Sequence, residues 1–482
     1  MNRKMVYFMT GRIILMVGAL MFLPLVVSFI YRDGGTLSFL ITIGSCAAVG
    51  LGLSLSFKPD SQVIYAKEGF LITALTWLTV SAIGALPFVI SGEIPNFIDA
   101  FFETVSGFTT TGASILTNVE GMSHSMLFWR SFTHWIGGMG VLVLMVAVMP
   151  NLSGRTIHVL RAEMPGPTMG KLVPRLRDTA KILYLLYIVL TALEFVLLLC
   201  GGMPMFDSAV HALGTAGTGG FGIRGDSIGS YSPYLQWVIA VFMMLFGINF
   251  NLYYLLVLRR FRSIFRSEEF WTYVIVVLSA SGLVCWNIFT RMHYAFPDAV
   301  RHAFFQVNTV VSTTGFSTVD FNLWPELSKT ILVLLMFMGG CAGSTAGGLK
   351  VSRLVLMFKN IRRELRRLLH PRSATAIRFE GKAVDNSTLS SVNTYFALYM
   401  GLLAGFVLIV SFQPGFNFLS NFTAVVSCFN NIGPGLDLVG PSANFAGYGG
   451  FFKVVLSFAM LFGRLEIYPM LISMSPSTWI KK

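Results

Sequence analysis

The sequence predicts an all-α polytopic membrane protein of ten transmembrane helices: two N-terminal helices, then four repeats of helix, pore helix, filter loop and helix around one pore. Three observations lead to this fold class. The 482-residue chain is 54% hydrophobic and only 12% charged, about half the charged fraction of a soluble globular protein. Its apolar residues lie in runs long enough to cross a bilayer. The shorter apolar stretches between those runs recur in four copies.

Each expected span is a mostly apolar run of about 20 residues or more, the length that crosses the hydrocarbon core as a helix. Basic residues Arg3, Lys4 and Arg12 precede the apolar stretch from Ile13 to Ile30, but no small-residue cleavage site follows it. We therefore expect a retained helix and not a signal peptide. A glycine-rich segment, 339–348, interrupts the eighth run. The runs lie near residues 11–31, 37–57, 69–91, 125–149, 181–202, 233–258, 270–291, 327–368, 389–412 and 448–475.

The expected spans divide the chain into five segments. Residues 1–66 hold the two N-terminal transmembrane helices, and residues 67–150 form pore repeat 1. Pore repeat 2, residues 151–262, begins with a basic cytoplasmic loop. Pore repeat 3, residues 263–385, contains an intramembrane gating loop and a basic cytoplasmic segment, and residues 386–482 form pore repeat 4.

Basic residues set the expected orientation. The chain has 35 Lys and Arg residues against 22 Asp and Glu, a formal net charge of +13. If the N-terminus is cytoplasmic, most basic residues fall on that side, with clusters at 150–180, 259–266 and 350–382. Because positively charged loops tend to stay in the cytoplasm, both termini are expected there. The outer face is then acidic, which suits an entry port for cations.

Four glycines placed in one column define the internal repeat, and we call them the column glycines. The tetrapeptides around them are Thr110-Thr111-Gly112-Ala113, Thr218-Gly219-Gly220-Phe221, Thr313-Thr314-Gly315-Phe316 and Asn431-Ile432-Gly433-Pro434. Twelve residues upstream, Ala100-Phe101-Phe102-Glu103 matches Ala303-Phe304-Phe305-Gln306. The following helix of each repeat carries a glycine: Gly137, Gly247, Gly339 and Gly463.

The physical properties of this repeat are those of a pore. A short helix that stops within the membrane aims its C-terminal end, equivalent to roughly half a negative charge, at its own loop. Glycine lets main-chain carbonyls face a common axis without a Cβ clash, and rings of carbonyl oxygens can replace the water shell of K⁺. The expected K⁺-binding filter residues are Thr110, Thr111, Gly112, Thr218, Gly219, Gly220, Thr313, Thr314, Gly315, Asn431, Ile432 and Gly433.

The filter tetrapeptides, the segment GGCAGSTAGGLK at 339–350 and the segment FGRLE at 462–466 together resemble the Trk/Ktr/HKT superfamily of potassium transporters, bacterial TrkH type. The resemblance covers the whole chain. It implies potassium uptake across the bacterial inner membrane, a homodimer with one filter per subunit, and a cytosolic nucleotide-binding regulator of the TrkA type. Rb⁺ is expected to be accepted as well as K⁺. Residues 350–382 and the 150–180 loop are the expected docking surfaces, with solvated or lipid-facing charge runs as the alternative.

The four filter loops differ in sequence, and these differences affect which cation the pore is expected to select. Loop two has extra glycines, and loop four lacks threonine, so discrimination between K⁺ and Na⁺ is expected to be modest. In plant-type relatives a serine at the position of Gly112 favours Na⁺. The glycine here therefore implies K⁺.

The interruption at 339–348 is expected to gate the pore. Its glycines oppose a regular helix, and in the third repeat it would lie beneath the filter as a movable obstruction; a rigid packed kink is the alternative. Arg464 lies in an otherwise apolar helix, where arginine costs about 2.5–3.5 kcal/mol on insertion scales. It is expected to form an electrostatic barrier under the filter, or to pair with a carboxylate. The expected gate residues are Gly339, Gly340, Gly343, Ser344, Thr345, Gly347, Gly348 and Arg464.

Other functions fit less well. The spans show no paired carboxylates, nucleophile–base pair or metal-ligand cluster, so neither an enzyme nor a cofactor is expected. Residues 217–222 match GxGxxG but follow a half-helix and not a strand, and Leu349 replaces the lysine that a P-loop needs. Contacts with membrane lipids are expected, and nucleic acid is not. Cation-coupled (H⁺ or Na⁺) secondary transport of potassium remains the alternative, since broken helices and repeats also occur in that class.

Overall fold

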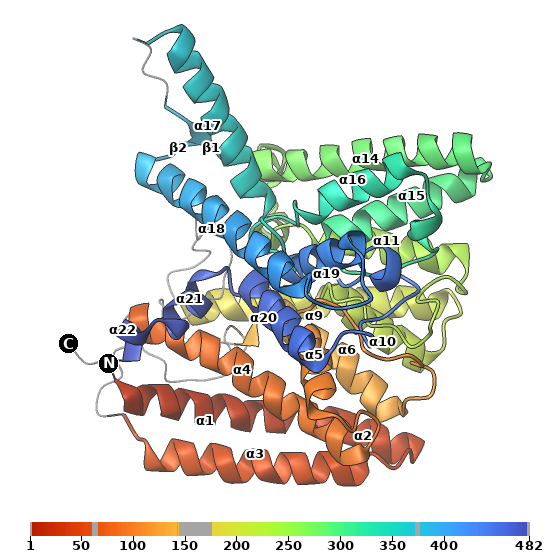
Figure 1. Ribbon diagram of the computed structural model, residues 1–482, viewed down its shortest axis with the longest axis vertical. Helices are drawn as coiled ribbons and strands as arrows, with labels where there is room; N and C mark the ends of the chain where they lie inside the picture. The colour runs from red at the N-terminus through yellow and green to blue at the C-terminus, as the bar shows by residue number, and fades with distance from the viewer. Residues whose placement is uncertain (1, 60–65, 142, 144–175, 372–375, 480–482) are drawn as a thin grey trace.

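The structure, a computed structural model, describes residues 2–59, 66–141, 143, 176–371 and 376–479. Nearly all of its regular structure is helical (Figure 1). The described residues also form a two-stranded antiparallel hairpin of β1 (Arg378–Phe379) and β2 (Lys382–Ala383). The expected all-helical membrane architecture is therefore confirmed.

The N-terminal helices pack as a pair. α1 (Arg3–Leu20) and α2 (Phe22–Tyr31) form one apolar run, and α3 (Thr36–Ser56) returns along α1. Small residues permit this close approach, because a Cβ added to Gly11 would lie 2.9 Å from Gly50 O. Such contacts between small residues are typical of helices packed in membranes.

Each repeat contributes a long first helix, a short pore helix and a second helix after the filter loop. Repeat 1 consists of α4 (Ala66–Ser91), α5 (Phe97–Phe108) and α6 (His124–Gly138). Repeat 2 consists of α9 (Leu176–Cys200), α10 (Met205–Ala216), α11 (Pro233–Phe246) and α12 (Phe250–Val257), and α13 (Phe261–Phe265) follows. Repeat 3 consists of α14 (Glu268–Met292), α15 (Phe296–Val311), η1 (Phe321–Leu323), α16 (Glu326–Met336) and α17 (Val351–Leu369). Repeat 4 consists of α18 (Asn386–Val410), α19 (Phe418–Asn430), η2 (Asp437–Val439), α20 (Gly450–Arg464), α21 (Tyr468–Met474) and α22 (Pro476–Trp479).

The second helices are broken, although a break was expected in only one of them, at 339–348. In the described residues, six helical runs are long and apolar enough to cross a membrane, and a seventh candidate is the pair α11 and α12, which meet at 93°. The break within 327–368 is the expected one, the expected span at 448–475 is also a pair of helices joined by irregular chain, and the one at 125–149 runs beyond the described residues. The helices end where they pack closely on the pore helices, since a Cβ on Gly137 would overlap Phe108 O of α5, and one on Gly463 would overlap Phe429 O of α19.

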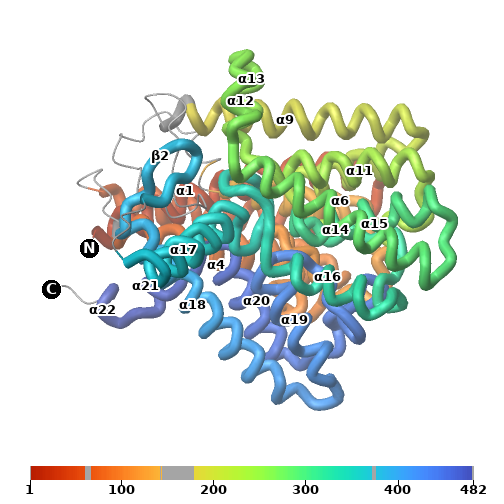
Figure 2. The backbone as a smooth tube through the Cα atoms, turned by 90° about the horizontal axis from the view of Figure 1, so that it is seen from above, coloured from red at the N-terminus to blue at the C-terminus, as the bar shows by residue number. Residues whose placement is uncertain are grey.

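The deepest burial is at the ends of the pore helices. Figure 2 shows the helices of successive repeats following one another around the molecule, from orange through yellow and green to blue. Residues 102–111, 214–219, 305–314 and 423–433 are buried throughout. These segments include the filter threonines. A polar centre within an apolar protein is the arrangement expected where a membrane protein lines a path for a polar solute.

Candidate functional site

The four filter loops close a ring of main-chain contacts. In each loop, a Cβ added to the column glycine would press on the carbonyl oxygen that precedes the column glycine of the next repeat. The pairs are Gly112 with Gly219 O, Gly220 with Thr314 O, Gly315 with Ile432 O, and Gly433 with Thr111 O. In the last pair the added Cβ of Gly433 would lie 2.7 Å from Thr111 O, so the series leads from repeat 4 back to repeat 1. Because such a chain of contacts closes only around a common axis, the structure brings all four predicted filter loops together.

All four loops share an unusual backbone conformation. Two residues before the column glycine, φ is 56° at Thr110, 54° at Thr218, 56° at Thr313 and 57° at Asn431. The column glycines are also at positive φ, between 75° and 104°. A left-handed conformation is uncommon outside glycine and is unfavourable for a β-branched residue such as threonine. Its recurrence at one position of four repeats indicates a functional constraint on the direction of the carbonyls.

The pore helices add a favourable field. α5, α10, α15 and α19 each end three or four residues before their own column glycine. Their C-terminal ends, equivalent to roughly half a negative charge each, therefore lie beside the ring. Fixed carbonyl dipoles and helix ends together suit a cation that has lost its water shell.

A cavity of about 290 Å³ opens on the side of the ring that faces the loops after the filters, and all four column glycines line it. Its lining includes the carboxylate of Glu120, which no sequence motif marked. Asp226, Asp320 and Asp437 lie in the same outer loops but are hydrogen-bonded within caps and turns. The hydroxyl of Ser420 donates to Asp437, and this hydrogen bond lowers the pKa of the carboxyl. It therefore stays ionised at neutral pH.

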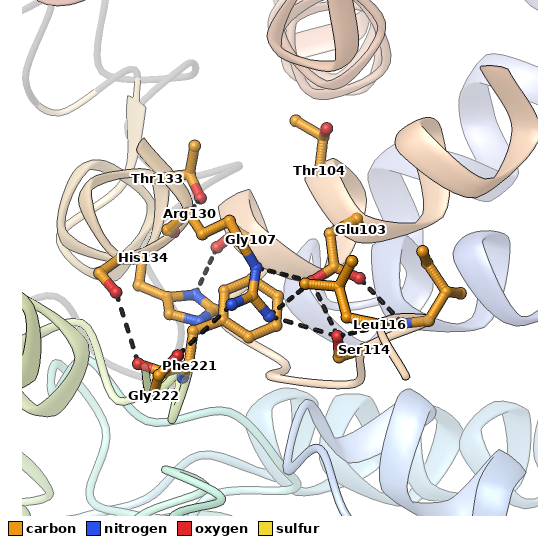
Figure 3. A network of polar contacts seen from close by, with 12 residues as sticks. Glu103, Thr104, Gly107, Ser114, Leu116, Arg130, Thr133, His134, Phe221 and Gly222 are labelled. Carbon is orange, nitrogen blue, oxygen red and sulfur yellow. Dashed lines mark hydrogen bonds and ion pairs between the residues drawn. The ribbon is translucent and has the colours of Figure 1, made fainter. Parts of the chain in front are cut away.

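A buried ion pair braces the first two filter loops (Figure 3). Glu103 Oε1 of α5 lies 2.7 Å from Arg130 Nη2 of α6, and both side chains are at most 2% exposed. The other carboxylate oxygen accepts a 2.9 Å hydrogen bond from Ile115 N, just after loop one. The guanidinium lies 4.0 Å from the centre of the Phe221 ring, directly after Gly220. The pair therefore constrains the loops of repeats 1 and 2 relative to each other.

His134 connects the same two loops (Figure 3). Its Nδ1 lies 2.7 Å from Gly107 O in α5, and its Nε2 accepts a 3.3 Å hydrogen bond from Phe221 N. With Nε2 as acceptor and Nδ1 as donor, the ring is in its neutral form. Sequence reasoning missed both Arg130 and His134. The signal that could have found them is that charged and polar side chains inside a span usually face the protein interior.

The predicted gating loop lies beneath filter loop three. The chain between α16 and α17 is not helical, as its glycines predicted. Gly347 N donates a 2.7 Å hydrogen bond to Thr313 Oγ1, and Cys341 N donates to Gly247 O at 2.9 Å. A cavity of only about 50 Å³ remains below the ring. Among the predicted gate residues, this cavity is lined by Gly343, Ser344, Gly347, Gly348 and Arg464, while Gly339, Gly340 and Thr345 pack against the loop itself or repeat 2.

Arg464 joins the loop to the break in repeat 1. Its Nη1 donates to Thr345 O at 2.8 Å, and its Nη2 donates to Gly137 O at 2.6 Å and Gly138 O at 2.7 Å. The neighbouring Glu466 pairs with Arg353 of α17. Arg464 therefore places a positive charge on main-chain carbonyls of two repeats, beneath the filter ring.

Comparisons with known proteins agree with this architecture. The profile of the TrkH family, a cation transport protein, matches residues 36–481. The Trk system potassium uptake protein TrkH of Salmonella typhimurium is 38% identical over 477 residues, covering 97% of this chain and 98% of the relative. The Escherichia coli (strain K12) Trk system potassium uptake protein TrkG is 33% identical, covering 99% and 98%. The crystal structure of the potassium transporter TrkH from Vibrio parahaemolyticus matches all of both chains, with a TM-score of 0.90 and 31% identity. The chain belongs to the TrkH family of cation transport proteins.

Proposed function

We propose that this chain conducts K⁺ into the cell across the bacterial inner membrane, through a channel-like pore with four non-identical filter loops. As a member of its family it is a Trk-type potassium uptake transporter and a multi-pass membrane protein, not an enzyme. The observation that carries the proposal is the closed ring in which each column glycine contacts the carbonyl before the next. Main-chain oxygens held in fixed positions are the ligands that replace the hydration shell of K⁺.

Sequence differences among the four filter loops affect the expected selectivity for K⁺ over Na⁺. Asn431 stands where the other three loops have threonine, and its Nδ2 donates to Thr111 Oγ1 and to Met460 O, both at 3.0 Å. Its amide nitrogen thus braces the ring. We expect K⁺ and Rb⁺ to pass, and Na⁺ to be discriminated against only modestly, because four unlike environments set the carbonyl positions.

The loop at 339–348 and Arg464 are the proposed gate, in which the loop fills the path and the guanidinium repels cations below the ring. Ten membrane passes are proposed, with each broken helix pair counted as one and both termini cytoplasmic. The five segments divided after residues 66, 150, 262 and 385 are part of the same proposal.

A homodimer and a cytosolic TrkA-type nucleotide-binding regulator are the proposed partners. One proposed docking surface, residues 350–382, includes α17, which projects from the body in Figure 1. The other, the loop at 150–180, lies mostly outside the described residues.

Ion uptake by the purified protein in liposomes tests the function. With K⁺ inside and tracer Rb⁺ outside, we expect Rb⁺ to accumulate, external K⁺ to compete strongly and external Na⁺ weakly. Empty liposomes are the control. Uptake no greater than in empty liposomes, with and without the regulator, would contradict the proposal. Single-channel currents in a planar bilayer would distinguish conduction from a transport cycle.

Glu194 favours a second candidate function, cation-coupled secondary transport. It lies in α9, is fully buried, and its two carboxylate oxygens have no hydrogen-bond partner in the described residues. Carboxyl groups inside membrane spans often carry protons in transporters. If K⁺ uptake is coupled to H⁺, a pH dye inside the liposomes should report acidification that Glu194→Gln abolishes. Acidification that persists in this variant would remove Glu194 from consideration.

A further inference from the structure

Glu269 ties together the two ends of the intramembrane loop. It lies in the first turn of α14 and is only 6% exposed. Its Oε1 accepts hydrogen bonds from Ala342 N at 2.7 Å and from Ser352 N at 3.1 Å. Ala342 is near the start of the loop, and Ser352 is in the first turn of α17, directly after the loop. One buried oxygen atom therefore holds both ends of the segment that fills the path below the filter.

The β1–β2 hairpin in turn holds the helix end that carries Glu269. Glu380, in the hairpin turn, accepts hydrogen bonds from Ser267 Oγ at 3.0 Å and from Glu269 N at 3.1 Å. A carboxylate is favourable there because the N-terminus of a helix has unpaired N–H groups and a partial positive charge. Lys359 of α17 binds the same end through an ion pair with Glu268. The hairpin and α17 are thus both attached to the first turn of α14.

The hairpin is a small packing unit with an exposed turn. Ile377 and Phe379 pack against α17 and α18 in an apolar cluster with Leu356, Leu389 and Val392. Glu380 itself is exposed. The connection from Glu380 through the first turn of α14 to Glu269 therefore links an exposed turn to the loop.

We propose that Glu269 and Glu380 are positioning residues that keep the intramembrane loop closed, and that they couple the exposed hairpin turn to the loop through the first turn of α14. The inference rests on the proposed function of the loop as a gate.

The native Cys341 reports on the loop independently of transport. It lies in the loop and is fully buried, so a thiol reagent reaches it only when the loop moves. With Cys46, Cys200, Cys285 and Cys428 replaced by alanine, Glu269→Leu should label about tenfold faster than its parent, because the acceptor of both loop-end hydrogen bonds is lost. Glu269→Gln keeps an acceptor oxygen and should label at the parent rate. Rb⁺ uptake should rise in the same order.

The hairpin variant tests the coupling. Glu380→Ala should accelerate Cys341 labelling by less than Glu269→Leu, because the bonds from Glu269 to the loop remain. In the double variant, the increase in the rate of Cys341 labelling should be less than the product of the two separate increases, since both residues act on the loop through the first turn of α14. Glu364→Ala is the matched control, because this exposed acid of α17 pairs, among the described residues, with side chains on the same helix, Arg363 and Arg367. It should change neither labelling nor uptake.

The outcomes separate this inference from the proposed function. Equal Cys341 labelling in the parent, Glu269→Leu and Glu380→Ala would overturn the inference whatever the uptake. Faster labelling in the two variants, with no Rb⁺ uptake even by the parent, would support the inference about the loop and contradict the proposed function. If Glu269→Leu does not give monodisperse protein, Glu380→Ala decides in the same assay, because its side chain is at the surface.

Discussion

The filter ring and the loop beneath it lie at neighbouring levels of one axis, yet they are held in different ways. The ring uses the same backbone conformation four times, and each contact is supplied by the next repeat. The loop occurs once and is held by single hydrogen bonds, such as those from Gly347 to Thr313 and from Arg464 to Thr345. A backbone conformation that four loops share, each in contact with the next, resists a change in any single loop. Single hydrogen bonds, each worth about 1 kcal/mol, suit a part that must move.

The largest effect is expected from a side chain in the ring. A Cβ at Gly220 would overlap Thr314 O and face a positive φ, so Gly220→Ala should abolish Rb⁺ uptake. Gly405→Ala is the matched control, because a Cβ there has open space in α18. The measurement is tracer uptake into liposomes at equal protein content. Wild-type uptake by Gly220→Ala would show that the ring is not the ion path.

The brace around the ring should be the next most sensitive feature. Arg130→Met leaves the Glu103 carboxylate buried without its partner, which should lower the free energy of unfolding by about 3–5 kcal/mol. Thermal unfolding in detergent measures this change. The pair of Lys329 and Glu326, whose glutamate side chain is 88% exposed, offers the control, since Lys329→Met should cost less than about 1 kcal/mol. Similar losses for both variants would mean that the ring does not depend on its buried pair.

The same contrast explains how much the sequence could predict. The column glycines were predictable because a backbone that must carry positive φ leaves its mark in residue type at a fixed spacing. Of the breaks in the second helices only the one at 339–348 was predictable, because Gly137 looks like any glycine of a membrane helix until Phe108 O is seen against it. Glu269 was also missed, since its partners are 73 and 83 residues away in the sequence. Backbone requirements are local, whereas the contacts that hold a moving part are made at a distance.

Arg464 tests whether charge or hydrogen bonding keeps the loop in place. Arg464→Ala removes donors to three carbonyls, so Rb⁺ uptake should rise by about tenfold. Arg464→Lys keeps the charge but lacks the planar fork that reaches several acceptors. Uptake near the wild-type level in the lysine variant would assign the effect to charge, and uptake near that of the alanine variant would assign it to hydrogen bonding. No rise in either variant would remove Arg464 from the gate.

Thr313 contributes to both the filter ring and the hydrogen bonds of the loop. Its substitution is expected to have the smallest effect on uptake, and it separates the two roles. Its backbone is part of the ring, while its hydroxyl accepts the hydrogen bond from Gly347 N of the loop. Thr313→Val keeps a β-branched side chain at the same backbone position and removes only that acceptor. The loop should loosen by about 1 kcal/mol, which raises uptake about fivefold, and the competition between K⁺ and Na⁺ should not change.

Thr110→Val is the matched control in repeat 1. Its hydroxyl has no hydrogen-bond partner in the described residues, and its φ is the same 56°. Thr110→Val therefore shows the effect of the substitution on the filter backbone alone, because no hydrogen bond to the loop is removed. If both variants raise uptake equally, the hydroxyl of Thr313 does not hold the loop. If Thr313→Val instead changes ion competition while uptake stays constant, the side chain acts in the ring, and the two levels are less separate than their geometry indicates.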